Sequence, residues 1–151
     1  MSRDNSNYAE YPDLDAKVSD VETATKESIT AGDGLSLLFT SGSTGRPKAA
    51  TLTHTNVVNS ARYIALQMKV TSNDTIAVPV PLFHAFGLIM GLCVGLIAGA
   101  TTVLPCEYFD AGQTLAAVQQ YSCTGLYGVT TMFVDYMSHP DFAKTVKRSL
   151  R

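Results

Sequence analysis

The chain has 151 residues, of which 46% are hydrophobic and 16% are charged, and its formal net charge is −2. This balance indicates a globular chain and excludes general disorder, which requires low hydrophobicity and high net charge. It also argues against a strongly basic nucleic-acid binder, so no nucleic-acid partner is expected. Residues 1–33 carry eight acidic and three basic side chains, whereas residues 144–151 carry four basic and no acidic ones.

The chain changes abruptly from polar to apolar composition near residue 34. Residues 1–33 are polar and are interpreted as a lead-in or linker. An apolar run at Leu35–Phe39 predicts a strand, and Ala49–Leu52 predicts a second strand after the intervening loop. Apolar residues at helical spacing predict an amphipathic helix over Thr55–Met68, with Thr53 or Thr55 as N-cap and Asn73-Asp74 as its end.

The second part alternates strand and helix patterns. The predicted elements are a short strand within Thr75–Pro81, an apolar stretch at Phe86–Ala100, a strand at Thr102–Leu104, a helix at Asp110–Tyr121 with Leu115 and Val118 inward, a strand near Gly125–Val129 and a short helix at Thr131–Met137. Strands that alternate with helices of ten or more residues predict an α/β layered fold with some parallel pairing.

The number and spacing of the three cysteines bear on the redox state of the compartment in which the protein is found. Cys93, Cys106 and Cys123 are odd in number and show no CxxC spacing, so we expect reduced thiols and neither a disulfide framework nor a zinc site. The N-terminus lacks a signal-peptide pattern. These features predict an intracellular, reducing compartment, either the cytoplasm or an organelle lumen.

The loop at residues 40–48 reads Thr-Ser-Gly-Ser-Thr-Gly-Arg-Pro-Lys. Its glycines let the backbone approach a ligand, its hydroxyls and free N–H groups donate to oxyanions, and Lys48 adds a charge that binds phosphate. The loop therefore predicts a polyphosphate cradle, with a flexible Ser/Gly turn as the alternative. It is not a Walker A loop, because Ala49 stands where that motif needs Ser or Thr.

Five stretches of the chain closely resemble the AMP-dependent synthetase and ligase (adenylate-forming) family. They are Leu38–Lys48, Leu52–Asn56, Pro81–Gly87, Gly99–Thr101 and Gly128–Phe133, in the order in which the family has them. The resemblance covers about residues 34–151 and is greatest for acyl-CoA synthetases of the medium-chain fatty-acid type. It implies that residues 34–151 form a partial AMP-binding (adenylation) domain, an incomplete part of the layered α/β N-terminal domain.

The resemblance also implies a reaction. A fatty or related carboxylic acid attacks the α-phosphate of ATP to give an acyl-adenylate and pyrophosphate, and coenzyme A then displaces AMP. The implied cofactors are ATP, Mg²⁺ and coenzyme A, and the implied partners are the nucleotide and the acid. The implied ligands of the ATP phosphates are Thr40, Ser41, Gly42, Ser43, Thr44, Gly45 and Lys48, with Thr44 also a candidate for Mg²⁺. The implied substrate pocket contains Phe83, His84 and Phe86, whereas His54 and Asn56 are expected to serve the start of the following helix.

Two substitutions and the chain length depart from the family pattern. Ala49 replaces a glycine and would restrict the backbone if that position needed a positive φ, and Thr130 replaces a proline that would fix a turn. The family's N-terminal portion, its magnesium-binding glutamate and its C-terminal lysine have no counterpart here. This predicts a fragment or truncated member that is inactive alone, with no catalytic residue of its own.

Two other interpretations compete with a ligase fragment. The first is a membrane protein with a Gly-rich apolar span at residues 86–104, where Gly87, Gly91, Gly95 and Gly99 recur every four residues. Such a stripe would equally let a buried helix pack closely on a sheet, and Pro79 and Pro81 oppose a long helix. The second is a non-catalytic remnant or interaction protein whose exposed edges associate with complementary segments or with a full-length homologue.

Overall fold

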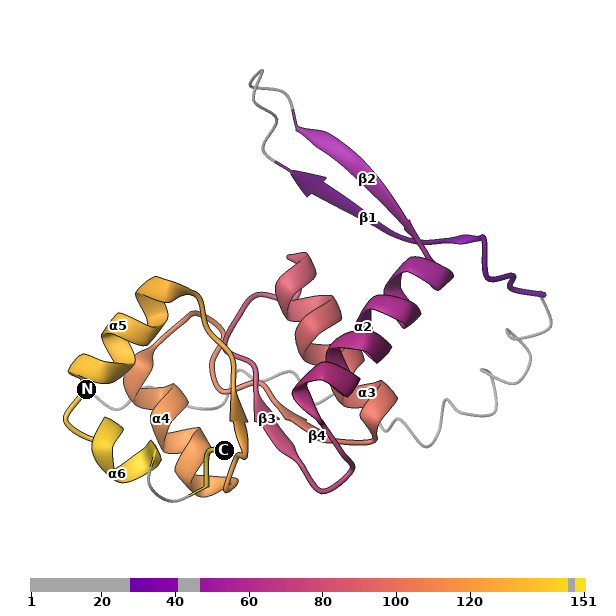
Figure 1. Ribbon diagram of the computed structural model, residues 1–151. Coiled ribbons are helices and arrows are strands. Elements are labelled where there is room, and N and C mark those ends of the chain that lie inside the picture. Colours follow the sequence, from indigo (N-terminus) through magenta and orange to yellow (C-terminus); the bar gives the residue numbers. More distant parts are fainter. Residues whose placement is uncertain (1–27, 41–46, 147–148) are drawn as a thin grey trace, which may run out of the picture. The chain divides into compact units, whose positions relative to one another are not determined.

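The structure is a computed structural model that describes residues 28–40, 47–146 and 149–151 (Figure 1). The chain divides into two compact units, Met1–Thr30 and Ala31–Arg151. All the helices and strands described below belong to the second unit.

A parallel three-stranded sheet organises this unit. Its strands are β3 (Thr75–Ala77), β4 (Thr101–Val103) and β5 (Gly125–Leu126), in the spatial order β4-β3-β5. Both neighbours pair with β3 in parallel, and parallel neighbours need long crossover connections. The crossovers carry the helices η1 (Phe86–Cys93, a π-helix), α3 (Val94–Ala98) and α4 (Ala111–Gln120). The predicted α/β layered fold with parallel pairing is confirmed.

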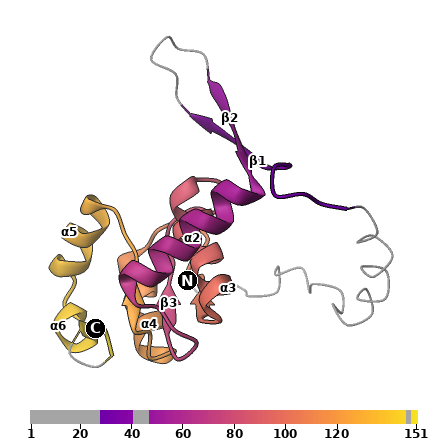
Figure 2. The same ribbon diagram turned by 45° about the vertical axis from the view of Figure 1, so that its right-hand side comes forward.

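Alternation along β3 creates two apolar layers. Ile76 and Val78 face a cluster that includes Val57 of helix α2 (His54–Met68) and Val94 of α3. Ala77 points the other way, toward a cluster that includes Val118 of α4. Figures 1 and 2 show the corresponding layers, with α2 and α3 on one face of the sheet and α4 on the other. The expectation that Leu115 and Val118 point inward is confirmed, since they are 1% and 0% exposed.

An antiparallel hairpin precedes α2. It consists of β1 (Gly34–Thr40) and β2 (Lys48–Thr53), both at the positions that the apolar runs predict. Leu35, Leu37 and Phe39 of β1 are 42%, 60% and 71% exposed, so this strand adds little to the core. The base of the hairpin is fixed at α2, where the backbone N–H groups of His54 and Thr55 donate to the carbonyls of Asp33 and Ala31.

Local hydrogen bonds set both ends of α2. Thr53 is the N-cap, and its side chain and that of Asn56 form a reciprocal capping box, which confirms the expected role of Asn56 at the helix start. The predicted span Thr55–Met68 is confirmed, whereas Asn73-Asp74, the expected stop signal, lies beyond the helix end. The helix stops after Met68 because Lys69 takes a left-handed conformation, with φ 55 and ψ 38.

The apolar stretch at residues 86–104 is broken into separate elements. The π-helix η1 is followed by α3, by Gly99 in a left-handed conformation, and by β4. A Cβ atom on Gly87 would strike the backbone carbonyls of Val80 and Pro81, and one on Gly91 would strike Val78. The glycine stripe therefore lets this helical segment pack against the sheet. No helix in the described part of the chain is long and apolar enough to cross a bilayer.

Two short helices complete the unit. These are α5 (Thr130–Ser138) and α6 (Phe142–Val146). The predicted helix at Thr131–Met137 corresponds to α5, whereas the strand expected near Gly125–Val129 is limited to the two residues of β5. Asp110 caps α4 by accepting a hydrogen bond from the N–H of Gln113 at 2.7 Å.

The close approach at Gly87 gives a first prediction. We expect Gly87→Ala to lower the free energy of unfolding by about 2 kcal/mol, because the new methyl group meets backbone carbonyls that cannot rotate away. Urea unfolding followed by circular dichroism measures the loss. Gly32→Ala is the matched control, since a Cβ there has open space around it. Equal stability of Gly87→Ala and the parent chain would contradict this packing.

Candidate functional site

The hairpin brings together the two ends of the predicted phosphate loop. Thr40 and Lys48 are register partners at the tip of the β1–β2 ladder, and the Thr40 hydroxyl donates to the Lys48 carbonyl at 3.4 Å. Directly opposed residues project from the same face of an antiparallel pair, so both side chains leave the same face. Both residues are exposed. Ser41, Gly42, Ser43, Thr44 and Gly45 lie outside the described residues.

The two departures from the family pattern are compatible with the backbone. Ala49 lies within β2 opposite Phe39, and positive φ among described non-glycine residues is confined to Lys69 and Ser122. The concern that Ala49 would restrict a left-handed position is therefore wrong. Thr130 is the first residue of α5, after the N-cap Val129. Proline is favoured at a first helical position because its fixed φ suits the helix, and here the helix starts there with threonine.

His84 is fixed at the start of the helical segment that follows β3. Its backbone N–H donates to the Pro81 carbonyl at 3.2 Å, and its ring Nδ1 accepts from the Phe86 N–H at 3.1 Å. In the neutral ring this leaves Nε2 as the protonated nitrogen. Because His84 is exposed, that N–H is able to donate a hydrogen bond to a ligand.

Phe83 and Phe86, predicted to share a pocket with His84, lie in different surroundings. Phe86 packs into the core, where its ring meets Tyr127 edge-on at a centroid distance of 5.5 Å. Phe83 is 85% exposed and lines a cavity of about 260 Å³. The opposite wall of this cavity comes from residues 104–109, which the sequence pattern did not single out. The structure thus places Phe83 at a cavity and Phe86 in the core.

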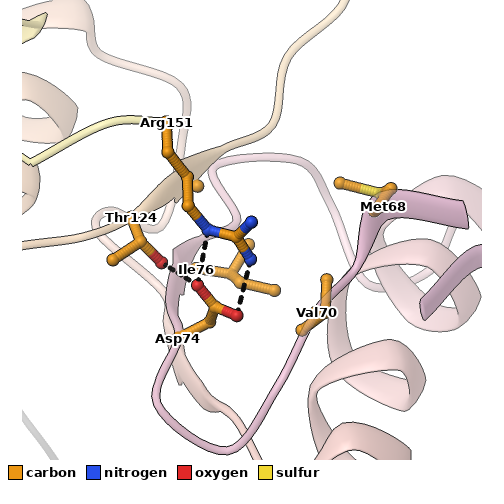
Figure 3. Close-up of a pocket in the computed structure, with 7 residues that line it drawn as sticks. Met68, Val70, Asp74, Ile76, Thr124 and Arg151 are labelled. Carbon is orange, nitrogen blue, oxygen red and sulfur yellow. Dashed lines mark hydrogen bonds and ion pairs between the residues drawn. The ribbon is translucent and has the colours of Figure 1, made fainter. Parts of the chain in front are cut away.

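A second polar site was also missed by the sequence patterns. Asp74, only 5% exposed, holds a carboxylate at the start of β3 that pairs with Arg151 (Figure 3). The guanidinium donates through Nη2 to Asp74 Oδ2 at 2.7 Å and through Nε to Oδ1 at 2.9 Å. Thr124 donates its hydroxyl to Oδ1 at 2.7 Å, and the Thr71 N–H donates to Oδ2 at 2.7 Å. Sequence spacing gives no signal for this cluster, because Asp74 and Arg151 are 77 positions apart.

The charged groups of the Asp74 cluster stabilise one another. The Arg151 guanidinium, followed by the Thr124 hydroxyl, holds the pKa of Asp74 well below its usual range, and Asp74 in turn raises the pKa of Arg151. Arg151 also donates to the Lys69 carbonyl at 2.9 Å. The ion pair therefore joins the end of α2, the start of β3 and the approach to β5. These contacts indicate that the Asp74–Arg151 ion pair stabilises the fold. The pair is separate from the exposed hairpin tip and from the Phe83 cavity.

The described residues contain no group of three or more His, Cys, Asp or Glu side chains that could hold a metal ion. The one metal ligand that the sequence suggested, Thr44, lies outside the described residues. All three cysteines are free thiols; Cys123 is buried, and Cys93 and Cys106 are half-buried. Burial raises the pKa of the Cys93 and Cys123 thiols, so these two are poor nucleophiles.

A β-hairpin joined to a parallel layered sheet matches part of the N-terminal domains of adenylate-forming enzymes. The fold matches ATP-bound MatB from Rhodopseudomonas palustris with a TM-score of 0.67 and 29% identity, over 74% of this chain and 22% of that one. The chain belongs to the AMP-binding enzyme family, whose model matches residues 2–151. The resemblance predicted from the sequence is confirmed.

Curated relatives are acyl-CoA ligases. The acyl-CoA ligase sidI of Beauveria bassiana is 41% identical over 140 residues, which cover 86% of this chain and 23% of that protein. The mitochondrial medium-chain acyl-CoA ligase ACSF2 of Danio rerio is 36% identical over 128 residues, which cover 83% of this chain and 21% of that protein. The chain thus spans about a fifth of the length of these relatives.

The Asp74 cluster gives a second prediction. We expect Asp74→Asn to lower the free energy of unfolding at pH 7 by about 2 kcal/mol, because the amide cannot match the charge-assisted hydrogen bonds. The folded-state pKa of Asp74 is depressed, so the wild-type advantage is present above the ordinary aspartate pKa of about 4 and is lost as the pH falls below it.

Urea unfolding of the two proteins across that pH range measures the effect. Asp135→Asn, at an exposed position of α5, is the matched control and should stay within about 0.5 kcal/mol of the parent chain. A difference between Asp74→Asn and wild type that does not shrink in acid would contradict the assignment.

Proposed function

We propose that this chain supplies the ATP-phosphate loop and part of the acid-binding wall of an ATP-dependent, AMP-forming acid–CoA ligase that acts on a fatty or related carboxylic acid. The observation that carries the proposal is the pairing of Thr40 with Lys48, which closes the hydroxyl- and glycine-rich segment into a hairpin loop. In the proposed reaction the acid attacks the α-phosphate of ATP and releases pyrophosphate. Coenzyme A then displaces AMP.

The residues present suit a polyphosphate. A loop of backbone N–H groups and hydroxyls next to a lysine neutralises and orients phosphate oxygens, and phosphoryl-type chemistry needs such positioning more than a side-chain nucleophile. Lys48 is exposed at the hairpin tip and makes no ion pair with a described residue. The similarity to ATP-bound MatB supports ATP as the nucleotide. We propose Thr40, Ser41, Gly42, Ser43, Thr44, Gly45 and Lys48 as the phosphate ligands.

Mg²⁺ and coenzyme A are proposed from the family. Mg²⁺ in phosphate-transfer sites is held by one or two protein ligands together with substrate phosphates and water, so a dedicated carboxylate cluster is not required. Thr44 is the proposed protein ligand of the ion. His84 and Phe83 are proposed to face the acid, His84 through its Nε2–H group and Phe83 through its exposed ring. The free thiols support a reducing intracellular compartment.

The chain alone is proposed to bind but not to complete the reaction. The relatives named acyl-CoA ligases are about five times as long as the part that these residues match. We assign to this chain the phosphate contacts and one wall of the acid pocket.

Nucleotide binding tests the loop assignment. We expect Lys48→Ala to weaken ATP binding about tenfold, since a charge-assisted contact to phosphate contributes about 1.5–3 kcal/mol. Isothermal titration with ATP gives the affinity, and circular dichroism verifies that the fold is retained. Arg62→Ala removes an equal charge from an exposed position of α2 and should bind ATP as the parent does. Unchanged binding by Lys48→Ala, or an equal loss in Arg62→Ala, would overturn the assignment.

Isotope exchange tests the proposal that the chain alone does not complete the reaction. We expect the 151-residue chain to show no acid-dependent exchange between ATP and pyrophosphate with octanoate as the acid. Exchange above a no-enzyme blank that is lost in Lys48→Ala would show that this chain forms the acyl-adenylate by itself.

A further inference from the structure

The cavity beside Phe83 lies where the chain leaves the carboxyl ends of two parallel strands. One wall is formed by residues 78–83, which follow β3, and the other by residues 104–109, which follow β4, with Met132 of α5 completing the lining. Its volume of about 260 Å³ suits a small or slender ligand. Crevices at the carboxyl ends of parallel strands are the common ligand sites of layered α/β sheets.

The cavity combines a buried interior with an aromatic mouth. Val78 and Val80 are 2% and 5% exposed, whereas Phe83 and Tyr108 are 85% and 81% exposed. These two rings come from loops on different strands, yet both line the same cavity. Exposed aromatic side chains that converge on one opening indicate a ligand that covers them.

The charge of the lining discriminates between ligand classes. Among the residues that the structure describes, the lining contains no Lys, Arg or His, and its one carboxylate is that of Glu107. Glu107 is exposed, whereas Cys106 is half-buried and lies 3.8 Å from the Thr114 hydroxyl. An interior of valines, leucine and proline with an acid at its rim repels a phosphate and accepts an uncharged hydrocarbon.

We infer that this cavity receives the hydrocarbon chain of the carboxylic acid, and that the β4–α4 segment Leu104–Phe109 is a specificity-determining wall. The inference rests on the proposed function, because it needs an acid substrate. It goes beyond the family motifs, since Leu104, Cys106, Tyr108 and Phe109 belong to none of the stretches that carry the resemblance. The chain length accepted then depends on these side chains.

Cys106 provides a direct readout of occupancy. We expect saturating octanoate, without nucleotide, to slow alkylation of Cys106 by iodoacetamide several-fold, because the hydrocarbon chain covers the cavity wall on which the thiol lies. Butanoate should protect much less, since its chain is too short to fill the interior. Mass spectrometry of chymotryptic peptides measures the rates, with half-buried Cys93, which lies outside the cavity lining, as an internal reference. Equal Cys106 rates with and without octanoate would overturn the inference.

A matched pair of variants tests the mouth of the cavity. We expect Tyr108→Ala to abolish most of the octanoate protection, whereas Tyr63→Ala, which removes another exposed ring, from α2, should preserve it. Both positions are exposed, so neither change should prevent folding, and circular dichroism verifies this. Equal protection in both variants would show that Tyr108 does not contact the chain.

The outcome is separable from that of the nucleotide experiment. If ATP binding is insensitive to Lys48→Ala but octanoate still protects Cys106, the phosphate assignment fails and the cavity assignment stands. If Lys48→Ala loses ATP and octanoate gives no protection, the cavity assignment fails alone.

Discussion

The arrangement of the unit depends on one steric constraint, the close approach of the η1–α3 segment to the sheet. The absence of a side chain at Gly87 and Gly91 lets the helical backbone lie against the carbonyls of Val80 and Pro81 and against Val78. These same residues continue β3 toward Phe83 and His84. The glycines therefore fix the distance between the helical layer and the sheet and, with it, the place where the Phe83–His84 segment leaves the core. The cavity beside Phe83 depends on this packing, because Val78, Val80 and Pro81 also line the cavity.

The second stabilising feature is the Asp74–Arg151 ion pair, at the opposite end of β3 from the contacts of Gly87 and Gly91. Asp74 lies before the strand and Phe83 follows it. The ion pair and the cavity therefore lie at opposite ends of one short strand. Burying a carboxylate is unfavourable unless hydrogen bonds and an opposite charge compensate it, and Arg151, Thr124 and Thr71 supply that compensation. The amino end of the sheet is thereby tied together, whereas the proposed ligand cavity lies at its carboxyl end, the usual ligand side of parallel α/β sheets.

The sequence predicted what local patterns encode. Short apolar runs and helical patterns located the strands, α2, α4 and α5, and the glycine repeat left close helix packing as one of two interpretations, because each signal lies within a few residues. The stop signal of α2 was wrongly assigned to Asn73-Asp74, because the helix is ended by Lys69 in a left-handed conformation that its residue type does not predict. The Asp74–Arg151 pair and the wall at 104–109 were missed for a different reason. Both arise only when the crossovers bring distant segments together, and neither has a local signature.

The proposed phosphate loop connects the two strands of a hairpin, and this limits how firmly the unit alone holds it. An isolated two-stranded ribbon is marginally stable in water. The described contacts anchor the β1–β2 ribbon at its base, through the first turn of α2, whereas Thr40 and Lys48 stand at the far tip. Leu37 and Phe39, near that tip, remain mostly exposed, so core packing does not fix it. The residue types of the proposed loop are thus encoded locally in the sequence, whereas positioning them on a nucleotide would require contacts beyond those of this ribbon.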